Sequence, residues 1–370
     1  MSQPADSLLQ AVRAQDFGHT PDAWRSGQAV DAFPSIDLAV VSFGLPGASA
    51  SASASASAAA AAAFAPSRPP RFANVLFSRE HPQGLVAQIS AQADAVQNIR
   101  FDADQRDATL ESPAWLPGAD WQRLRWTHLH GTGRHRFVAP YPASLLKLMV
   151  AVSLGLAVDA GKTTWPLVAT MLVPMITVSD NDATDACVAL LHRLGLVDAL
   201  NQRLAQLGLH TLQLNRTTRG GGWRNADGAG VGQIHMTAWD TVRLLWLLDA
   251  DAPPAPWLPP HTALLQPATR DLLRAVLARQ QLDEILSSGA LRAVPGWVPG
   301  LPDAPAFAHK TGTTQNYASD AGIVRSEGCH YLVAVLTSLG RRHAPHEACA
   351  TTWRLPALGA AVHQIMERTA

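Results

Sequence analysis

The stretch "YPASLLKLMVAVSLG", from Tyr141 to Gly155, contains a serine and a lysine three positions apart at the head of an unbroken apolar run. From Ser144 to about Asp159 the sequence is apolar on nearly every side, a pattern that predicts a helix buried all round. Lys147 lies inside this run. Because residues three apart share one helix face, we expect the side chains of Ser144 and Lys147 to lie within hydrogen-bond reach.

Lysine is rare in this chain. Only three of its 29 basic residues are lysines, namely Lys147, Lys162 and Lys310. An ammonium can lose its proton at an accessible pKa, whereas a guanidinium cannot, and burial favours the neutral amine. A neutral amine can accept the proton of a serine hydroxyl. We therefore interpret Ser144 and Lys147 as a nucleophile and its base, and Lys162, which follows Gly161, as an ordinary residue at a helix end.

Two further short motifs accompany this pair. "SDN", Ser179–Asn181, supplies a hydroxyl and an amide at the start of a helix predicted over 182–194. "KTG", Lys310–Gly312, supplies a second ammonium on a strand predicted over 306–314, where the glycine lets a substrate backbone approach. S-x-x-K, S-D-N and K-T-G together are the signature of class A β-lactamases and penicillin-binding proteins. Residues 84–370 resemble the penicillin-recognising serine hydrolases, most closely the class A β-lactamase branch.

This resemblance implies a role for each matching residue. Ser144 would be the acylated nucleophile and Lys147 its proton acceptor, while Ser179 would pass a proton to the leaving nitrogen. Asn181 would hold a substrate amide carbonyl.

The third motif would bind the other end of the substrate. Lys310 with Thr311 would bind its carboxylate, and the backbone N–H groups of Ser144 and Thr313 would form the oxyanion hole. The resemblance implies neither a cofactor nor a metal.

One residue of the family pattern is missing. Class A β-lactamases hydrolyse their acyl-enzyme with a glutamate between the second and third motifs, but the only glutamate there is Glu284, which falls late, in "QLDEILSSG". Thr217 and Thr218 stand near the expected place. Asp227 could substitute, although an aspartate in "NADG" is typical of a turn. We therefore expect slow deacylation.

The order of elements predicts an α/β fold with an antiparallel five-stranded sheet flanked by helices, plus an all-helical lobe. Segments 306–314, 319–325 and 330–339 are predicted as strands whose short connections require antiparallel pairing. Helical spacing of apolar residues predicts a helix over 84–96. Two strands about a glycine-containing turn are predicted over 122–140.

A low-complexity Ser/Ala tract at 48–63 divides the chain. We expect an N-terminal extension over 1–70 and a β-lactamase-like serine hydrolase domain over 71–370. The possible strand "IDLAVVSFG" before the tract is either part of that extension or a first strand separated from the rest by an insertion.

Composition argues against other classes. The net charge is formally zero, with 29 basic and 29 acidic residues, so nothing recommends a nucleic-acid partner. No apolar stretch is long enough for a membrane span. The histidines of "HLHGTGRH" and "HAPHE" lack the spacing of a zinc protease pair, and three cysteines make no disulfide framework.

No secretory signal is recognisable, which indicates the cytoplasm, whereas cell-wall substrates would require the periplasm.

Three functions stay open. The first is a serine hydrolase acting on β-lactams. The second is a D-alanyl-D-alanine carboxypeptidase or esterase using the same site, and the third is a protein that binds penicillin or cell-wall fragments without turnover. Each implies a small-molecule partner, a β-lactam or a D-Ala-terminated acyl donor, and the sequence leaves the oligomeric state open.

Overall fold

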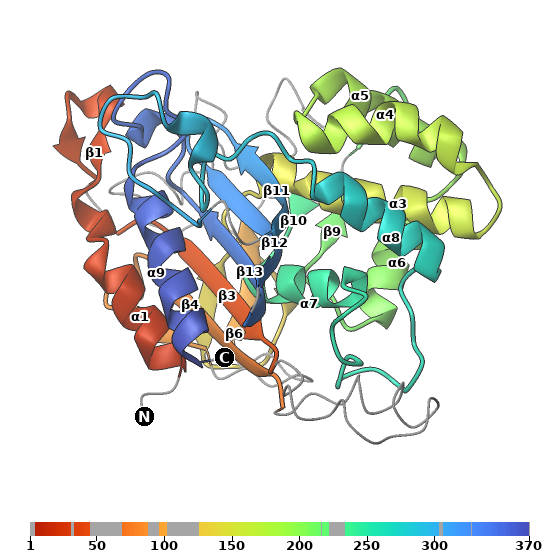
Figure 1. The fold of residues 1–370 in the computed structure, drawn as a ribbon, viewed down its shortest axis with the longest axis horizontal. Helices are drawn as coiled ribbons and strands as arrows, with labels where there is room; N and C mark the ends of the chain where they lie inside the picture. Colours follow the sequence, from red (N-terminus) through yellow and green to blue (C-terminus); the bar gives the residue numbers. More distant parts are fainter. Residues whose placement is uncertain are drawn as a thin grey trace.

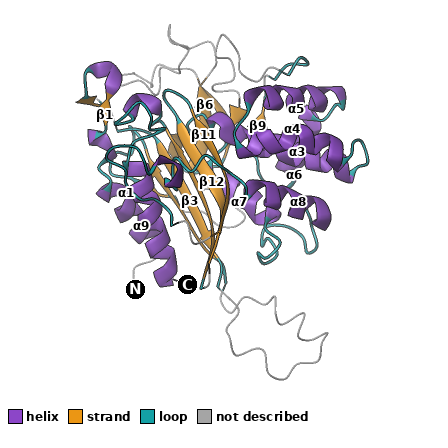
Figure 2. Ribbon diagram, turned by 45° about the horizontal axis from the view of Figure 1, so that its top comes forward, coloured by secondary structure: helices purple, strands orange, loops and turns teal. Residues whose placement is uncertain are grey.

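The computed structural model describes residues 4–30, 33–44, 69–87, 96–101, 126–215, 217–221, 234–302, 306–326 and 328–369. A central sheet is covered on one face by the two terminal helices and on the other by a lobe of helices (Figure 1). The same layers are visible in the turned view, where the sheet separates the two groups of helices (Figure 2).

The main sheet has the strand order β11-β12-β13-β3-β4-β5, and every neighbouring pair is antiparallel. Its strands are β3 (Ile36–Ser42), β4 (Arg71–Phe77), β5 (Leu85–Val86), β11 (Ala306–Thr313), β12 (Ala318–Ser326) and β13 (Cys329–Thr337). The predicted antiparallel sheet with a helical lobe is confirmed. The two-residue β5 adds a sixth strand to the five expected.

The strand before the Ser/Ala tract lies in the middle of this sheet. Val40 of β3 pairs with Val333 of β13 on one side and with Ala73 of β4 on the other. The segment "IDLAVVSFG" is therefore not part of an N-terminal extension. It is a first strand of the sheet, separated from the next strand by an insertion. A domain boundary at residue 70 would separate β3 from β4, so we propose that residues 4–30 and 33–44 belong with the sheet instead of with an extension.

Each face of the sheet has its own apolar core. On one face, α1 (Pro4–Ala14) and α9 (Arg354–Thr369) bury residues such as Leu8, Val12 and Leu358. On the other face, α7 (Ala238–Leu248) packs on β3 and β13 and connects the sheet to the lobe. The lobe contains α3 (Lys147–Asp159), α4 (Trp165–Thr177), α5 (Asn181–Arg193), α6 (Val197–Gln206) and α8 (Pro267–Leu277).

Helix α3 lies at the centre of the lobe, as the apolar run from Ser144 predicts. Its residues from Lys147 to Gly155 are all buried, and it packs against α4, α5, α6 and α8. Burial on all sides explains why its sequence is apolar all round. The helix predicted over 182–194 is confirmed as α5.

A second, smaller sheet has the order β7-β6-β8, with β6 (Val96–Phe101), β7 (Trp126–His130) and β8 (His135–Val138). The two strands predicted within 122–140 are present, but both pair with β6, β7 antiparallel and β8 parallel. The helix predicted over 84–96 is not found at either end of that segment, where the chain forms β5 and β6 instead. Residues 88–95, between these strands, are outside the described residues. Pairing with distant strands overrode a short apolar pattern that suits either element.

The remaining described elements are short. They are η1 (Phe17–His19), β1 (Pro21–Asp22), η2 (Ala23–Arg25), β2 (Gln28–Ala29), η5 (Ala143–Leu146), β9 (Gln213–Leu214), β10 (Ile234–His235), η6 (Gly289–Leu291) and η7 (Arg341–His343). Among the helices that the structure describes, none combines the length and apolar character needed to cross a membrane.

Candidate active site

The turn η5, which carries Ser144, is held tightly against β11. The hydroxyl of Ser319 donates to the carbonyl of Pro142 at 2.6 Å. A Cβ on Gly312 would lie 2.5 Å from the same carbonyl oxygen and 2.6 Å from the backbone nitrogen of Leu145, so only glycine permits this approach. Ser144 itself is partly exposed at the head of α3. The K-T-G glycine therefore sets the distance between the strand and the serine turn.

Lys147 begins α3 and its side chain is 0% exposed. Its Nζ donates to the carbonyl oxygen of Ser179 at 2.6 Å, to the Ser179 hydroxyl at 3.0 Å and to Oδ1 of Asn181 at 2.9 Å. A longer bond of 3.4 Å joins Nζ to the carbonyl of Asp180, so the acceptors around it suffice for the three protons of an ammonium. The structure thus joins the first and second motifs, which are separated by the whole of α4.

Ser179 lies between α4 and α5 in the left-handed backbone region, with φ 56°. For a residue other than glycine this conformation costs about 1–3 kcal/mol, and it persists only where surrounding contacts impose it. Asp180 follows as the N-cap of α5, its carboxylate accepting from the backbone N–H of Ala183 at 2.7 Å. The cap and the bond from Lys147 together hold Ser179 at the helix start.

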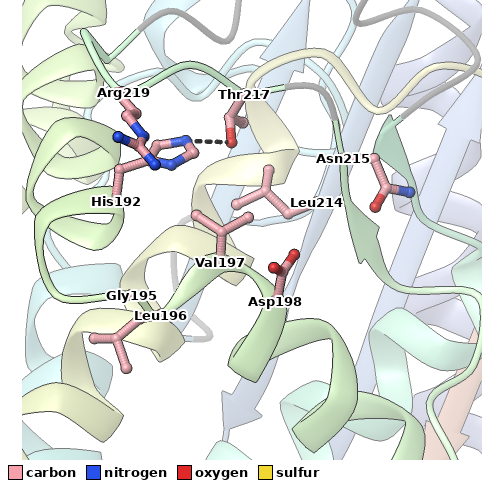
Figure 3. Close-up of a pocket in the computed structure, with 9 residues that line it drawn as sticks. All are labelled: His192, Gly195, Leu196, Val197, Asp198, Leu214, Asn215, Thr217 and Arg219. Carbon is pink, nitrogen blue, oxygen red and sulfur yellow. Dashed lines mark hydrogen bonds between the residues drawn. The ribbon is translucent and has the colours of Figure 1, made fainter.

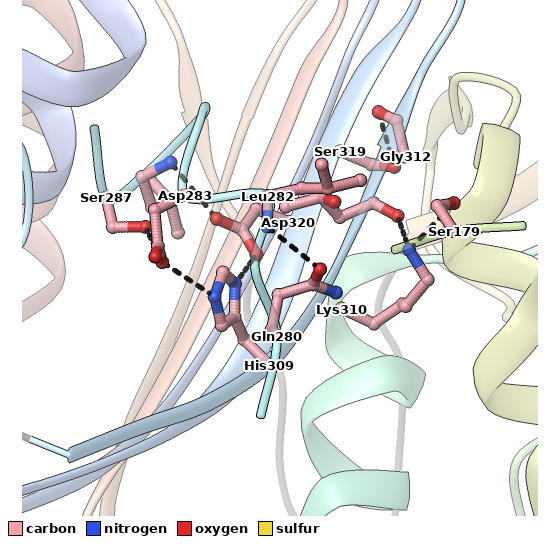
Figure 4. Close-up of polar contacts among 12 residues, drawn as sticks. Ser179, Gln280, Leu282, Asp283, Ser287, His309, Lys310, Gly312, Ser319 and Asp320 are labelled. Carbon is pink, nitrogen blue, oxygen red and sulfur yellow. Dashed lines mark hydrogen bonds and ion pairs between the residues drawn. The ribbon is translucent and has the colours of Figure 1, made fainter. Parts of the chain in front are cut away.

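Lys310 brings the third motif to the same hydroxyl. Its buried Nζ donates to Oγ of Ser179 at 3.1 Å and to the carbonyl of Thr311 at 2.7 Å (Figure 4). Burial, and then repulsion by Lys147, hold the pKa of Lys310 well below its usual value. Two amines therefore converge on one serine, and one of them, Lys310, loses its proton more readily than an ordinary lysine. Thr311 is buried beside them, and Thr313, at the end of β11, is partly exposed.

Behind Lys310, an imidazole bridges two carboxylates. Nδ1 of the buried His309 contacts Oδ1 of Asp320 at 2.8 Å, and its Nε2 contacts Oδ1 of Asp283 at 3.1 Å (Figure 4). Burial alone would lower the pKa of His309, but Asp320 and Asp283 outweigh it and raise that pKa. This array, Asp283–His309–Asp320, ties the segment after α8 to β11 and β12. No short sequence motif marks this array, because its members are far apart along the chain.

Glu284 is a further residue near this strand that no sequence motif marks. It follows Asp283, is partly buried, and lies within electrostatic range of Lys310 and Arg341. Burial raises the pKa of its carboxyl group, and the attraction of Arg341 and Lys310 opposes this rise only in part. Glu284 occurs late in the sequence, and only the fold shows that the chain comes back at this point to β11, the strand with the K-T-G motif.

The residues near the expected position of the deacylating glutamate line a separate pocket. This cavity of about 320 Å³ is lined by His192, Gly195, Leu196, Val197, Asp198, Leu214, Asn215, Thr217 and Arg219 (Figure 3). Nε2 of His192 contacts the Thr217 hydroxyl at 2.9 Å. His192 lies near the end of α5 and Asn181 at its start, about 16 Å apart at 1.5 Å per residue. The pocket is therefore distinct from the lysine cluster. Asp227 lies outside the described residues.

The histidine and cysteine motifs form no metal centre within the part of the chain that the structure describes, where no group of three or more potential ligands is placed to hold an ion. The ring of His130 stacks on His210 at 4.3 Å, and Nε2 of His128 contacts the carbonyl of Gly131. Cys187, Cys329 and Cys349 are free and buried.

The antiparallel sheet, its helical lobe and the arrangement of the three motifs define a β-lactamase-like serine hydrolase fold. The chain belongs to the beta-lactamase enzyme family Beta-lactamase2, whose model matches residues 166–355. The matched stretch includes Ser179–Asn181 and Lys310–Gly312 and begins after Ser144 and Lys147.

Several solved structures are similar. PBP-A is 21% identical, with 62% of this chain and 81% of that chain covered and a TM-score of 0.44. A class A beta-lactamase from Bacteroides cellulosilyticus DSM 14838 is 20% identical, with 62% and 84% covered and a TM-score of 0.44. A beta-lactamase from Sphaerobacter thermophilus DSM 20745 is 18% identical, with 66% and 87% covered and a TM-score of 0.44. No curated protein matches this chain.

Proposed function

We propose that this protein is a serine hydrolase that is acylated on Ser144 by β-lactams or related amides and esters. The observation that carries the proposal is the convergence of Lys147 and Lys310 on the hydroxyl of Ser179, beside the turn that presents Ser144. Two buried amines that share one acceptor destabilise the folded protein, and this cost favours a chemical role for them over a purely structural one.

In the proposed reaction, neutral Lys147 accepts the proton of Ser144 while the serine oxygen attacks the substrate carbonyl. The carbonyl oxygen becomes an oxyanion, which the backbone N–H groups of Ser144 and Thr313 stabilise. When Lys147 becomes an ammonium, oxygens of Ser179, Asp180 and Asn181 are within reach to accept its protons. Proton transfer therefore leaves no buried donor unsatisfied.

Ser179 delivers a proton to the leaving nitrogen as the carbon–nitrogen bond breaks. Its oxygen accepts hydrogen bonds from Lys147 and Lys310, which occupies both lone pairs and leaves the O–H free to donate toward the substrate. Lys147 returns the proton taken from Ser144 along this path, so the proton count balances. The product is an ester on Ser144.

A second candidate is a D-alanyl-D-alanine carboxypeptidase or esterase that uses the same residues. The observation in its favour is that Thr217, near the expected position of the deacylating glutamate, contacts His192 in the separate pocket. Without a positioned base, water attacks the Ser144 ester slowly, with a loss of about 10²–10⁴ in rate. Such a site suits a slow carboxypeptidase or esterase better than rapid β-lactam hydrolysis. A non-turnover binding protein is the remaining alternative.

Intact-mass measurement after incubation with a penicillin tests the proposal. We expect a burst near one equivalent, slow turnover, and a covalent adduct on the wild type that Ser144→Ala lacks. Rapid turnover without an accumulated adduct would contradict slow deacylation. If neither β-lactams nor acyl-D-Ala esters give an adduct or turnover, the hydrolase proposal fails and binding without chemistry is favoured.

A further inference from the structure

The turn 314–317, between β11 and β12, lies against both segments that carry the proposed oxyanion donors. It directly follows Thr313, the last residue of β11. The buried ring of Tyr317 contacts the ring of Tyr141 edge to face, with centroids 5.7 Å apart, and Tyr141 is three residues before Ser144. The position of this turn therefore affects both the end of β11 and the segment that leads to the serine.

The 3-10 helix η7 is joined to this turn through its backbone. The N–H of Arg341 donates to the carbonyl of Thr314 at 3.0 Å, and the N–H of Arg342 donates to the carbonyl of Gln315 at 2.9 Å. A Cβ on Gly340 would lie 2.3 Å from the carbonyl oxygen of Thr314, so only glycine permits this approach. Helix η7 is therefore fixed directly against the turn.

The side chain of Arg342 connects the turn to the N-terminal segment of the chain. It is buried, and its Nη1 donates to Oδ1 of Asn316, in the turn, at 3.0 Å. Its Nε donates to Oδ1 of Asp22 at 3.2 Å, and its Nη2 donates to Oδ2 of the same carboxylate. One guanidinium thus bridges the turn to a carboxylate that lies 320 positions earlier in the sequence.

This bridge is shielded from water and depends on the shape of the guanidinium. Asp22 is fully buried, and the ring of Trp24 covers the guanidinium with its centroid 4.2 Å from Cζ of Arg342. The carboxylate neutralises the cation, which allows the charge to stay buried. An arginine binds a carboxylate with two nitrogens and still has a third N–H group for the amide of Asn316. A lysine, with a single nitrogen, cannot reproduce this arrangement.

We propose that Arg342, held by Asp22, is a positioning residue for acylation, because it fixes the turn and with it the oxyanion donors. This rests on the proposed function, in which the backbone N–H groups of Thr313 and Ser144 stabilise the oxyanion. The N-terminal segment thereby contributes to the site through Arg342. Since the oxyanion forms only as the substrate carbonyl is attacked, displaced donors lower the rate of acylation and leave the affinity for the substrate unchanged.

Single-turnover acylation of the full chain by a reporter penicillin separates rate from affinity. Arg342→Lys keeps the charge but loses the bridge. We expect its limiting acylation rate to fall about 10- to 100-fold, as for donors displaced by up to about 1 Å, with an unchanged half-saturating penicillin concentration. Arg341→Lys is the matched control, because this neighbouring side chain is exposed and its backbone bond to the turn is retained. It should acylate at the wild-type rate.

Asn316→Ala tests the bridge at its other end. It removes the acceptor in the turn and keeps the buried ion pair between Arg342 and Asp22, so it disturbs folding less than Arg342→Lys. Its limiting rate should fall in the same direction. If both residues act through one bridge, the double variant should be no slower than the slower single variant, whereas independent effects would multiply.

The labelled fraction separates positioning from folding, since a variant that only misfolds labels a smaller fraction at the wild-type rate. A wild-type limiting rate in either Arg342→Lys or Asn316→Ala would therefore overturn the proposal, whatever the labelled fraction. Multiplying effects in the double variant, or a raised half-saturating concentration at an unchanged limiting rate, would also overturn it. Absence of labelling in the wild type would instead contradict acylation of Ser144, so the two failures are distinguishable.

Discussion

Ala143 and Ser179, on either side of Lys147, have left-handed backbones with φ 50° and 56°, although neither is glycine. Each conformation is strained, and each is held by a specific contact: Ser319 binds the carbonyl of Pro142, and Lys147 binds the carbonyl of Ser179. At the residue scale, the candidate site therefore depends on a few hydrogen bonds that fix unfavourable backbone geometry.

Lys147→Arg should reduce acylation by orders of magnitude although it preserves the charge, because a guanidinium does not deprotonate and cannot act as a base. The measurement is single-turnover labelling by a reporter penicillin, with Lys162→Arg at an exposed position as the control. Labelling of the Lys147 variant at a near wild-type rate would remove this residue from the mechanism.

Gly312→Ala should destabilise the protein by about 1–3 kcal/mol and slow acylation, because the new methyl group would overlap the Pro142 carbonyl and shift the Ser144 turn. Chemical denaturation and penicillin labelling measure the two effects. Gly220→Ala is the control, since a Cβ there meets nothing within 4 Å. Unchanged stability and labelling of the Gly312 variant would show that the turn is free to move.

At the scale of elements, the site lies where three of them meet: the head of α3, the start of α5 and the strand β11. The Asp283–His309–Asp320 array joins β11 to β12 and to the segment after α8. Because the central imidazole of this array gains two carboxylate partners on folding, the stability of the junction depends on pH.

His309→Gln should destabilise the protein, and the difference from wild type should depend on pH. The folded-state pKa of His309 is raised, so the stabilisation is fully present below the unfolded pKa near 6.5 and is lost as pH rises through the folded pKa. Loss of the buried hydrogen bonds alone costs about 1–3 kcal/mol. Denaturant midpoints over a pH series measure the difference. A difference that grows with rising pH would contradict the assignment.

At the scale of the whole molecule, the main sheet is built from both ends of the chain. β3 lies between β13 and β4, and the register pairs Ser42 with Arg71. The ends of these two antiparallel strands are therefore neighbours, so a short loop can connect them.

Replacement of residues 45–68 by a five-residue hairpin loop should preserve cooperative unfolding and penicillin labelling, because loop length contributes little to stability. Deletion of residues 1–70 should abolish cooperative unfolding, because it removes the strand between β13 and β4. Thermal unfolding followed by circular dichroism measures both. A folded deletion variant would mean that the N-terminal segment is an extension after all.

The sequence by itself determined the local features of this protein. The apolar run from Ser144, the capping residues at the start of the helix predicted over 182–194 and the short turns between the last three strands each depend on neighbouring residues, and they predicted α3, α5 and the antiparallel strands correctly. The three short motifs indicated the family for the same reason, since each is complete within four residues.

Tertiary structure decided what depends on residues far apart in the chain. It placed β3 at the centre of the main sheet and put β7 and β8, which were predicted as a pair, on opposite sides of β6. It also brought Asp283 into contact with His309, and Glu284 into electrostatic range of Lys310. Strand partners and the charges around a buried carboxylate are set by which distant segments pack together, and packing energy is not encoded in any short window of sequence.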